Sequence, residues 1–260
     1  MSPRGYALFD LDHTLLPHDT QVLFCNFVLR KKGNGWRRIY LLWFLPLFPL
    51  ALVKVVSLRF MKRVFSGYLA GLSGEKVRAY AREFAESVVP HVAYEETVAE
   101  LRRHQAEGRI TILNSASPEF YVEEIARHWG FDHYLGTNLI IEQKMPLFPK
   151  IMGPNNKHGA KITAMQERGM LPDEFDASDP DARLPDSVAY SDSSADVPLL
   201  SIAERGYMIH PSANFAETGT ERQWETMTPP RPYASKLGDR WTQLRQALGL
   251  YKISQGVRPA

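Results

Sequence analysis

The chain has 260 residues and a formal net charge of +2, which is too small to indicate a nucleic-acid partner. Hydrophobic residues make up 44% and charged residues 23%, an ordinary globular composition that argues against extensive disorder. The single cysteine, Cys25, cannot form an internal disulfide, and we expect it to be buried as a small apolar residue. The N-terminus runs almost directly into a strand and leaves no room for a secretory signal peptide, so we expect a cytoplasmic protein.

The stretch from Tyr6 to Phe9 is a short apolar run that predicts a buried strand of a parallel sheet. Asp10 and Asp12 follow it directly. Ligands of open α/β sheets bind beyond the carboxyl ends of the strands, where these two carboxylates could lie side by side. Such a pair is destabilised by repulsion unless a cation neutralises it or one acid keeps its proton. The pair therefore indicates a metal site, an acid–base role or both, although turn or helix capping is the commoner use of such acids.

Residues 21–82 contain helix-forming segments and no convincing strand, which predicts a helical cap inserted after the first strand. We expect an α/β core with a parallel sheet at residues 1–16 and 90–215, a cap at 17–89, and a C-terminal extension at 216–260. The extension contains an amphipathic helix that we expect to pack on the core. Its apolar residues at near-helical spacing are Trp241, Leu244, Leu248 and Tyr251.

The cap contains an uncharged run from Ile39 to Val53, which is shorter than the roughly 20 residues that span a bilayer. Pro46 and Pro49 would break a helix here, so we expect a kinked and mostly buried helix pair. Basic residues before the run and Lys54 within its extension to residue 58 keep an alternative open. In that alternative, residues 39–58 form a hairpin inserted in a membrane or lying on its surface.

The middle of the chain predicts a helix over 95–107 ended by Gly108, and then a second buried strand over 109–114. The turn Ser115-Ala-Ser117-Pro118 leads into a helix over 119–129, with Pro118 suited to its first position. Ser115 and Ser117 could cap this helix, or they could help to hold a phosphate or carboxylate at its N-terminus.

The last third begins with an expected hairpin over 136–149, followed by a helix that opens near Lys157 and Lys161 and runs to residue 168. Lysines at a helix start oppose the helix dipole, so they are not there for helix stability. A loop at 171–185 precedes a third strand, which is expected over 187–190. The acidic residues Asp192 and Asp196 follow this strand and precede a short helix. A final strand is expected over 206–209.

Taken in chain order, these strand ends resemble the four motifs of the haloacid dehalogenase superfamily of phosphohydrolases, in its phosphoserine-phosphatase-like branch. Phe9-Asp-Leu-Asp-His-Thr14 resembles the Asp-x-Asp-x-Thr signature, with His13 where many members have glycine. Asn114-Ser115-Ala-Ser-Pro resembles the second motif, and Tyr190-Ser-Asp192-Ser-Ser-Ala-Asp196 resembles the fourth. Lys161 fits the third motif better than Lys157. The resemblance implies a Rossmann-like, three-layer α/β/α core with a helical cap.

The resemblance also implies a chemistry for the acidic residues. Asp10 would be the nucleophile that takes the phosphoryl group as an aspartyl-phosphate, and Asp12 would protonate the leaving alcohol and then activate water. Mg²⁺ would be held by the Asp10 carboxylate, the Asp12 backbone carbonyl and Asp192, with Asp196 supporting that shell. A haloacid dehalogenase proper would need neither the second aspartate nor the metal, so Asp12 indicates phosphate chemistry.

Three further residues have roles that the resemblance implies. Ser115 and Lys161 would bind the oxygens of the transferring phosphoryl group, because its charge needs fixed donors and a cation. Thr14 would belong to the phosphate-binding residues together with Ser115 and Lys161, and it would orient the loop after the nucleophile.

The expected function is Mg²⁺-dependent hydrolysis of a phosphomonoester, either a small metabolite or a lipid-linked phosphate. The motifs handle only the phosphoryl group, so the substrate and the oligomeric state are not readable. Leu45-Pro-Leu-Phe-Pro-Leu50 resembles the apolar segment of phosphatidylglycerophosphatases, which favours a lipid phosphatase at the inner face of the membrane, with Phe44 and Phe48 presented to it. The rival hypothesis is a non-catalytic phospho-ligand-binding or membrane-associated scaffold.

Overall fold

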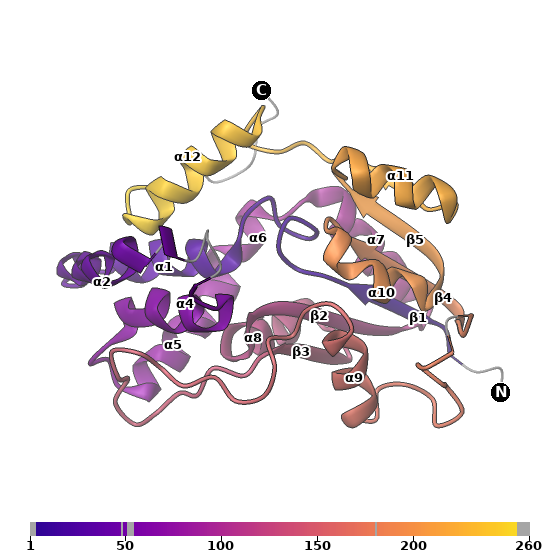
Figure 1. Ribbon diagram of the computed structural model, residues 1–260, viewed down its shortest axis with the longest axis horizontal. Coiled ribbons are helices and arrows are strands. Elements are labelled where there is room, and N and C mark those ends of the chain that lie inside the picture. The colour runs from indigo at the N-terminus through magenta and orange to yellow at the C-terminus, as the bar shows by residue number, and fades with distance from the viewer. Residues whose placement is uncertain (1–3, 48, 51–54, 180, 254–260) are drawn as a thin grey trace.

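The computed structural model of the chain describes residues 4–47, 49–50, 55–179 and 181–253. Its centre is a six-stranded sheet in the order β3-β2-β1-β4-β5-β6, in which all neighbouring strands are parallel. β1 lies between β2 and β4, so the residues that follow it emerge at the middle of the sheet edge (Figure 1). The strands are β1 (Tyr6–Phe9), β2 (Ile110–Pro118), β3 (His133–Thr137), β4 (Leu184–Ser191), β5 (Ala203–Ile209) and β6 (Glu225–Met227).

Helices cover both faces of this sheet because its strands are apolar on both sides. Phe9 faces a core shared with α7 (Glu95–Ala106) and α8 (Glu119–Trp129). Leu8 faces a second core, shared with α9 (Ala160–Glu167), α10 (Val197–Ser201) and α11 (Ala213–Glu221). The predicted three-layer, Rossmann-like α/β fold is therefore confirmed. Gly108, with φ of 75°, follows α7 where the sequence predicts the helix to end.

A ladder of stacked aromatic rings connects the three central strands on the α7 side. The Phe9 and Tyr190 ring centroids lie 4.5 Å apart and those of Tyr190 and Tyr207 lie 4.9 Å apart, with nearly parallel planes. These residues are register partners across β1, β4 and β5. The Tyr190 hydroxyl lies 2.8 Å from His104 Nε2 and donates to Glu100 Oε2 at 3.0 Å. The ladder thus holds the register that places the end of β1 beside the end of β4.

The cap is helical in its described part, as the sequence predicts. Three of its helices begin at a side-chain cap, because Asp19, Ser57 and Ser73 each accept a hydrogen bond from a first-turn N–H. The elements are α1 (Thr20–Arg30), η1 (Gly35–Tyr40), α2 (Leu41–Phe44), η2 (Leu45–Leu47), α4 (Leu58–Phe65), η3 (Ser66–Leu69), α5 (Gly74–Ser87) and α6 (Val89–Val92).

Aromatic side chains join the cap to the core. Phe24 of α1 lies 5.2 Å from Phe84 of α5 and 5.2 Å from Tyr121 of α8, measured between ring centroids. All three are fully buried in a cluster that also contains Phe9 and Cys25. Cys25 is therefore the small buried residue that the sequence predicts. The cap therefore shares the hydrophobic core on the α7 and α8 side of the sheet.

The expectation that the apolar run is mostly buried is wrong for its described residues. Tyr40 and Phe44 pack against Phe65, with ring centroids 5.5 and 5.1 Å away. Leu42 and Trp43 are 67% and 53% exposed, because the short helices here bury only one of their faces. Residues 48 and 51–54 lie outside the described residues. Among the helices of the described part, none is both long and apolar enough to cross a bilayer.

Several other elements differ from the expectations. β2 continues to Pro118, with a register shift after Asn114, so Pro118 is the N-cap of α8 and neither serine caps that helix. The expected hairpin at 136–149 is confirmed in part, because β3 ends at Thr137 and the two limbs of the long arm that follows are joined by an isolated antiparallel bridge between Leu139 and Ile151. A second bridge, between Ser73 and Lys144, joins this arm to the cap.

The C-terminal part also departs from the expectation. α11 and β6 continue the core past residue 215, and β6 pairs with β5 as an edge strand. α12 (Lys236–Ala247) contacts α1 of the cap. Its expected apolar face is largely in solvent, since Trp241 is 60% and Leu244 is 46% exposed. Tyr251, beyond the helix, is the residue that packs inward, with its ring edge-on to His18 at 5.5 Å.

We expect Tyr190→Phe to lower the free energy of unfolding by about 1–3 kcal/mol, because it leaves buried His104 without its hydroxyl partner. Tyr207→Phe is the matched control in the same ladder, and its loss should stay below about 1 kcal/mol because that hydroxyl is closer to solvent. Urea unfolding followed by circular dichroism measures both. Equal losses would contradict a special role for the Tyr190 hydroxyl.

Candidate active site

The loop after β1 is folded tightly around Leu11. Asp10 N–H donates to the Tyr190 carbonyl at 3.0 Å, which continues the pairing of β1 with β4. The Leu11 carbonyl then accepts from the N–H groups of Thr14, Leu15 and Leu16, at 3.3, 3.0 and 3.2 Å. His13 has a positive φ of 57°, a conformation that glycine adopts with less strain. This turn holds Asp10 and Asp12 at the carboxyl edge of the sheet.

Asp10 is buried at the floor of this site. Its Oδ1 accepts from Lys161 Nζ at 2.7 Å, and its Oδ2 accepts from the Thr14 hydroxyl at 3.4 Å. Burial raises the pKa of Asp10 to about 7, and the positive charge of Lys161 opposes that rise. Asp196 and Asp12 add repulsion. An ionised Asp10 in this place therefore requires cationic partners.

Lys161 supplies one of these cations. Its ammonium group lies 2.7 Å from Asp10 Oδ1 and 2.7 Å from Asp196 Oδ2, and the side chain is fully buried. Asp196 Oδ2 also accepts from the Ser191 hydroxyl at 2.8 Å. Of the two lysines that the sequence offered, Lys161 forms this contact, while Lys157 lines the same pocket. The positive charge of Lys161, which is unfavourable near a helix N-terminus, is thus compensated by two carboxylates.

Asp12 is held at the N-terminus of α1. Its Oδ1 accepts from the Thr20 backbone N–H at 2.7 Å and from the Thr20 hydroxyl at 2.5 Å. Its Oδ2 accepts from the Ser117 hydroxyl at 2.6 Å. Three donors from the cap and the end of β2 therefore keep this carboxylate in one orientation beside Asp10.

Asp192 lines the same pocket as Asp10 and Asp12. Its backbone N–H donates to the Thr14 hydroxyl at 3.0 Å, so Thr14 bridges the ends of β1 and β4. Burial raises the pKa of Asp192 well above its usual value, and the nearby charge of Asp10 raises it further. Buried acids with raised pKa values are suited to binding a cation that compensates their charge.

This donor set fits a hard divalent cation such as Mg²⁺. The Asp10 and Asp192 carboxylates and the Asp12 carbonyl are oxygen donors of the kind that Mg²⁺ prefers, with water and substrate completing the shell. The expected set contains two acidic side chains and a main-chain carbonyl. Within the described residues, no three acidic, histidine or cysteine side chains converge on one metal position. These residues would therefore supply only some of the oxygen ligands of such a cation.

The two serines of the second motif occupy different environments. Ser115 is fully buried, its Oγ accepts from the Ser117 N–H at 3.0 Å, and it does not line the pocket. Ser117 lines the pocket and donates to Asp12. The Ser115 carbonyl and the Asn114 amide oxygen both accept from Asn156 Nδ2, at 2.8 and 2.7 Å. Phosphate binding by the Ser115 hydroxyl stays a prediction.

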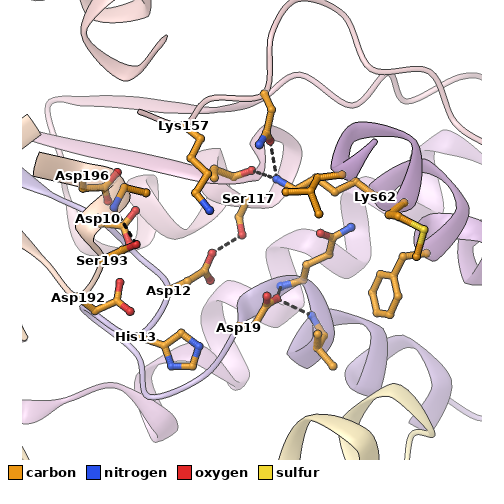
Figure 2. Close-up of a pocket in the computed structure, with 18 of the residues that line it drawn as sticks. Asp10, Asp12, His13, Asp19, Lys62, Ser117, Lys157, Asp192, Ser193 and Asp196 are labelled. Carbon is orange, nitrogen blue, oxygen red and sulfur yellow. Dashed lines mark hydrogen bonds between the residues drawn. The ribbon is translucent and has the colours of Figure 1, made fainter. Parts of the chain in front are cut away.

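The carboxylates open into a pocket of about 460 Å³ between core and cap, shown in Figure 2. Asp10, Asp192 and Asp196 lie on one side, and the cap residue Lys62 lies on the other (Figure 2). Lys62 Nζ donates to the Ala116 carbonyl at 2.5 Å and to Asn155 Oδ1 at 2.7 Å. Burial lowers the pKa of Lys62.

Lys62, Asn155 and Asp19 also line the pocket, and no sequence pattern predicted them there. Asp19 caps α1 and borders the pocket, and burial raises its pKa, with further repulsion from Asp12. A capping pattern around Asp19 was available as a signal for the helix start. Lys62 had no such signal, because a lysine on an amphipathic helix is usually solvated.

The C-terminal segment contributes a further contact that the sequence did not indicate. The Tyr233 hydroxyl donates to the Pro17 carbonyl at 2.8 Å and lies 3.3 Å from His13 Nδ1. Because the Tyr233 hydroxyl donates its proton to the Pro17 carbonyl, its oxygen accepts a hydrogen bond from the Nδ1–H group of His13. His13 borders the pocket of Figure 2 and also a second cavity of about 320 Å³, which Tyr233 and Asp192 line.

Comparison with known proteins agrees with this geometry. The family model of haloacid dehalogenase-like hydrolases matches residues 7–201. Protein CicA of Caulobacter vibrioides is 30% identical over 206 residues, covering 77% of this chain and 84% of its own. Histidinol-phosphatase of Neisseria meningitidis is 23% identical over 242 residues, covering 86% and 98%.

Solved structures show the same fold. A Bordetella pertussis protein of unknown function is 26% identical, with a TM-score of 0.69, covering 87% of this chain and 99% of its own. A phosphoserine phosphatase, solved as a phospho-aspartyl intermediate analogue, is 16% identical, with a TM-score of 0.54 and coverage of 88% and 95%. The family match, which spans all four motifs, identifies the chain as a member of the haloacid dehalogenase-like hydrolase family.

Proposed function

We propose that the protein is a Mg²⁺-dependent phosphomonoester hydrolase that works through an aspartyl-phosphate on Asp10. The observation that carries the proposal is the convergence of Asp10, Asp12, Lys161 and Asp192 on one pocket from three separate segments, namely the loop after β1, the start of α9 and the end of β4. Relatives named as a histidinol-phosphatase and as a phosphoserine phosphatase support a phosphatase reaction. A non-catalytic scaffold would not need all four of these side chains in one pocket.

The first step transfers the phosphoryl group to Asp10. A carboxylate oxygen of Asp10 attacks phosphorus, the bond from phosphorus to the leaving oxygen breaks, and Asp12 donates a proton to that oxygen. Lys161 stabilises negative charge at the Asp10 side of the reaction. Thr20 and Ser117 keep the Asp12 carboxyl group directed into the pocket.

The second step returns Asp10 to its free form. Asp12, now a carboxylate, removes a proton from water as the water oxygen attacks phosphorus. The bond between phosphorus and the Asp10 oxygen breaks, and inorganic phosphate leaves. Asp10, Asp192 and the Asp12 carbonyl would hold Mg²⁺, which when bound compensates the charge of the carboxylates and of the phosphoryl oxygens.

Asp10→Asn should lower the hydrolysis of a generic aryl phosphate at least about a thousand-fold, because the amide cannot act as the nucleophile. Circular dichroism should show an intact fold. Asp173→Asn, at an exposed loop position, is the control and should hydrolyse the aryl phosphate at the wild-type rate. Activity near wild type in Asp10→Asn would rule out the covalent mechanism.

Asp192→Asn should raise the Mg²⁺ concentration needed for half-maximal activity about ten-fold or more, because one anionic oxygen donor is replaced by an amide. Mg²⁺ should also raise the melting temperature of the wild-type protein more than that of the variant. If the Mg²⁺ titration and the thermal shift were both unchanged, Asp192 would not be a metal ligand.

Tyr233→Phe should lower kcat for the aryl phosphate about ten-fold, because the loop that carries Asp10 and Asp12 loses its contacts through His13 and Pro17. KM should change little, since Tyr233 does not line the catalytic pocket. In a His13→Gly background the same substitution should have a smaller effect, because part of the contact is already absent. Equal effects in both backgrounds would show that Tyr233 does not act through His13.

A further inference from the structure

The cap carries a surface of large apolar side chains. We call it the cap apolar surface, and it extends over η1, α2, η2 and the start of α4, with α2 in contact with the other three elements. Soluble proteins rarely leave such a group of side chains in water without a partner. Its exposed members are Trp36, Ile39, Leu42, Trp43, Leu45, Leu58 and Phe60.

This surface is continuous with the wall of the catalytic pocket. Leu58 is 65% exposed and also lines the pocket, and half-buried Phe44 lines it from α2. Val22, Met61 and Phe65 extend the same wall inward. The pocket is therefore charged at the Asp10 end and apolar toward the cap. A phosphomonoester bound at Asp10 would direct its leaving group along apolar side chains to the protein surface.

The charge of the surrounding segment indicates what covers this surface. Residues 20–74 contain nine lysine and arginine residues and no aspartate or glutamate, whereas the whole chain has a net charge of +2. Arg38 is exposed on η1 together with Trp36, and Arg59 is exposed on α4 next to Leu58. Tryptophan beside arginine suits the boundary between lipid headgroups and acyl chains. Two such cationic surfaces would repel each other, which argues against a second copy of this chain.

We infer that the cap apolar surface docks on an anionic lipid bilayer and that the substrate is a phosphomonoester with an apolar chain, drawn from that bilayer along the Phe44–Leu58 wall. The inference rests on the proposed phosphatase function and specifies its substrate class. The bilayer contributes negative headgroups to Arg38 and Arg59 and an apolar interior to the exposed leucine and tryptophan side chains.

The test uses the full chain and two sets of sedimentable vesicles, one of phosphatidylcholine alone and one mixed with phosphatidylglycerol. Wild-type protein should sediment with the mixed vesicles and much less with phosphatidylcholine. Leu42→Asp with Trp43→Asp should lower the bound fraction at least about ten-fold, because two exposed anchors become anions. Neither residue lines the pocket, so hydrolysis of a soluble aryl phosphate should be unchanged.

The chain offers a matched control on α12. Leu237→Asp with Trp241→Asp makes the same two changes at side chains that are 77% and 60% exposed, outside the cap apolar surface. This variant should sediment with the mixed vesicles as the wild type does. Equal loss of binding in both variants would show that added negative charge alone weakens binding, and it would overturn the assignment to the cap.

A second measurement tests the substrate class with n-alkyl phosphates of increasing length, each below its micelle concentration. From butyl to octyl phosphate, kcat/KM should rise at least about ten-fold, because added methylene groups leave water for the apolar wall. The inference would be overturned if kcat/KM did not change with alkyl chain length, or if the wild-type protein did not sediment with mixed vesicles. Hydrolysis of the aryl phosphate would in either case still support the phosphatase function. Concentration-dependent self-association that buries Trp43 without vesicles would also overturn it. Absence of any Mg²⁺-dependent hydrolysis would instead reject the proposed function itself.

Discussion

The ammonium group of Lys161 lies between the carboxylates of Asp10 and Asp196, and the arrangement of the site depends on this contact. All three groups are buried, so each would be costly to ionise alone. Their mutual attraction is strengthened by the low local dielectric and extended by the Ser191 hydroxyl. Asn114 accepts from Asn156 and donates to the Lys161 carbonyl, which fixes the start of α9 at the same edge. Lys161 thereby links the ends of β1 and β4 through its ammonium group and the end of β2 through its backbone carbonyl.

The acidic motif residues were predictable because strand ends of a parallel sheet meet at one edge, whatever the chain does between them. Short apolar runs located β1, β2, β4 and β5, and these determined where Asp10 and Asp192 lie. The choice of Lys161 over Lys157 was predicted from a resemblance, and the geometry agrees with it. Neither the apolar runs nor the motif resemblance predicted that Ser115 is buried and that Ser117 lines the pocket instead.

The residues that were missed share a physical reason. Lys62 and Asn155 reach the pocket from a cap helix and a long arm, and their positions depend on how these segments pack on the core. Tyr233 comes from the far end of the chain and has no local signal. β6 is three residues long and mostly exposed, so it lacks the apolar pattern that identifies a strand. The exposure of Trp43 was mispredicted because an apolar run does not reveal whether its second face finds a partner.

The position of β1 in the sheet has a consequence for how the chain folds during synthesis. β1 is synthesised well before its register partners, which lie near residues 110 and 187. Until the second of these has been made, one edge of an apolar strand stays unpaired and open to association with other chains. Contacts so distant in sequence also slow folding, because long loops must close before they are formed. The buried Phe9–Tyr190 stack and the complete set of acids can therefore exist only after the chain has been synthesised as far as Asp196.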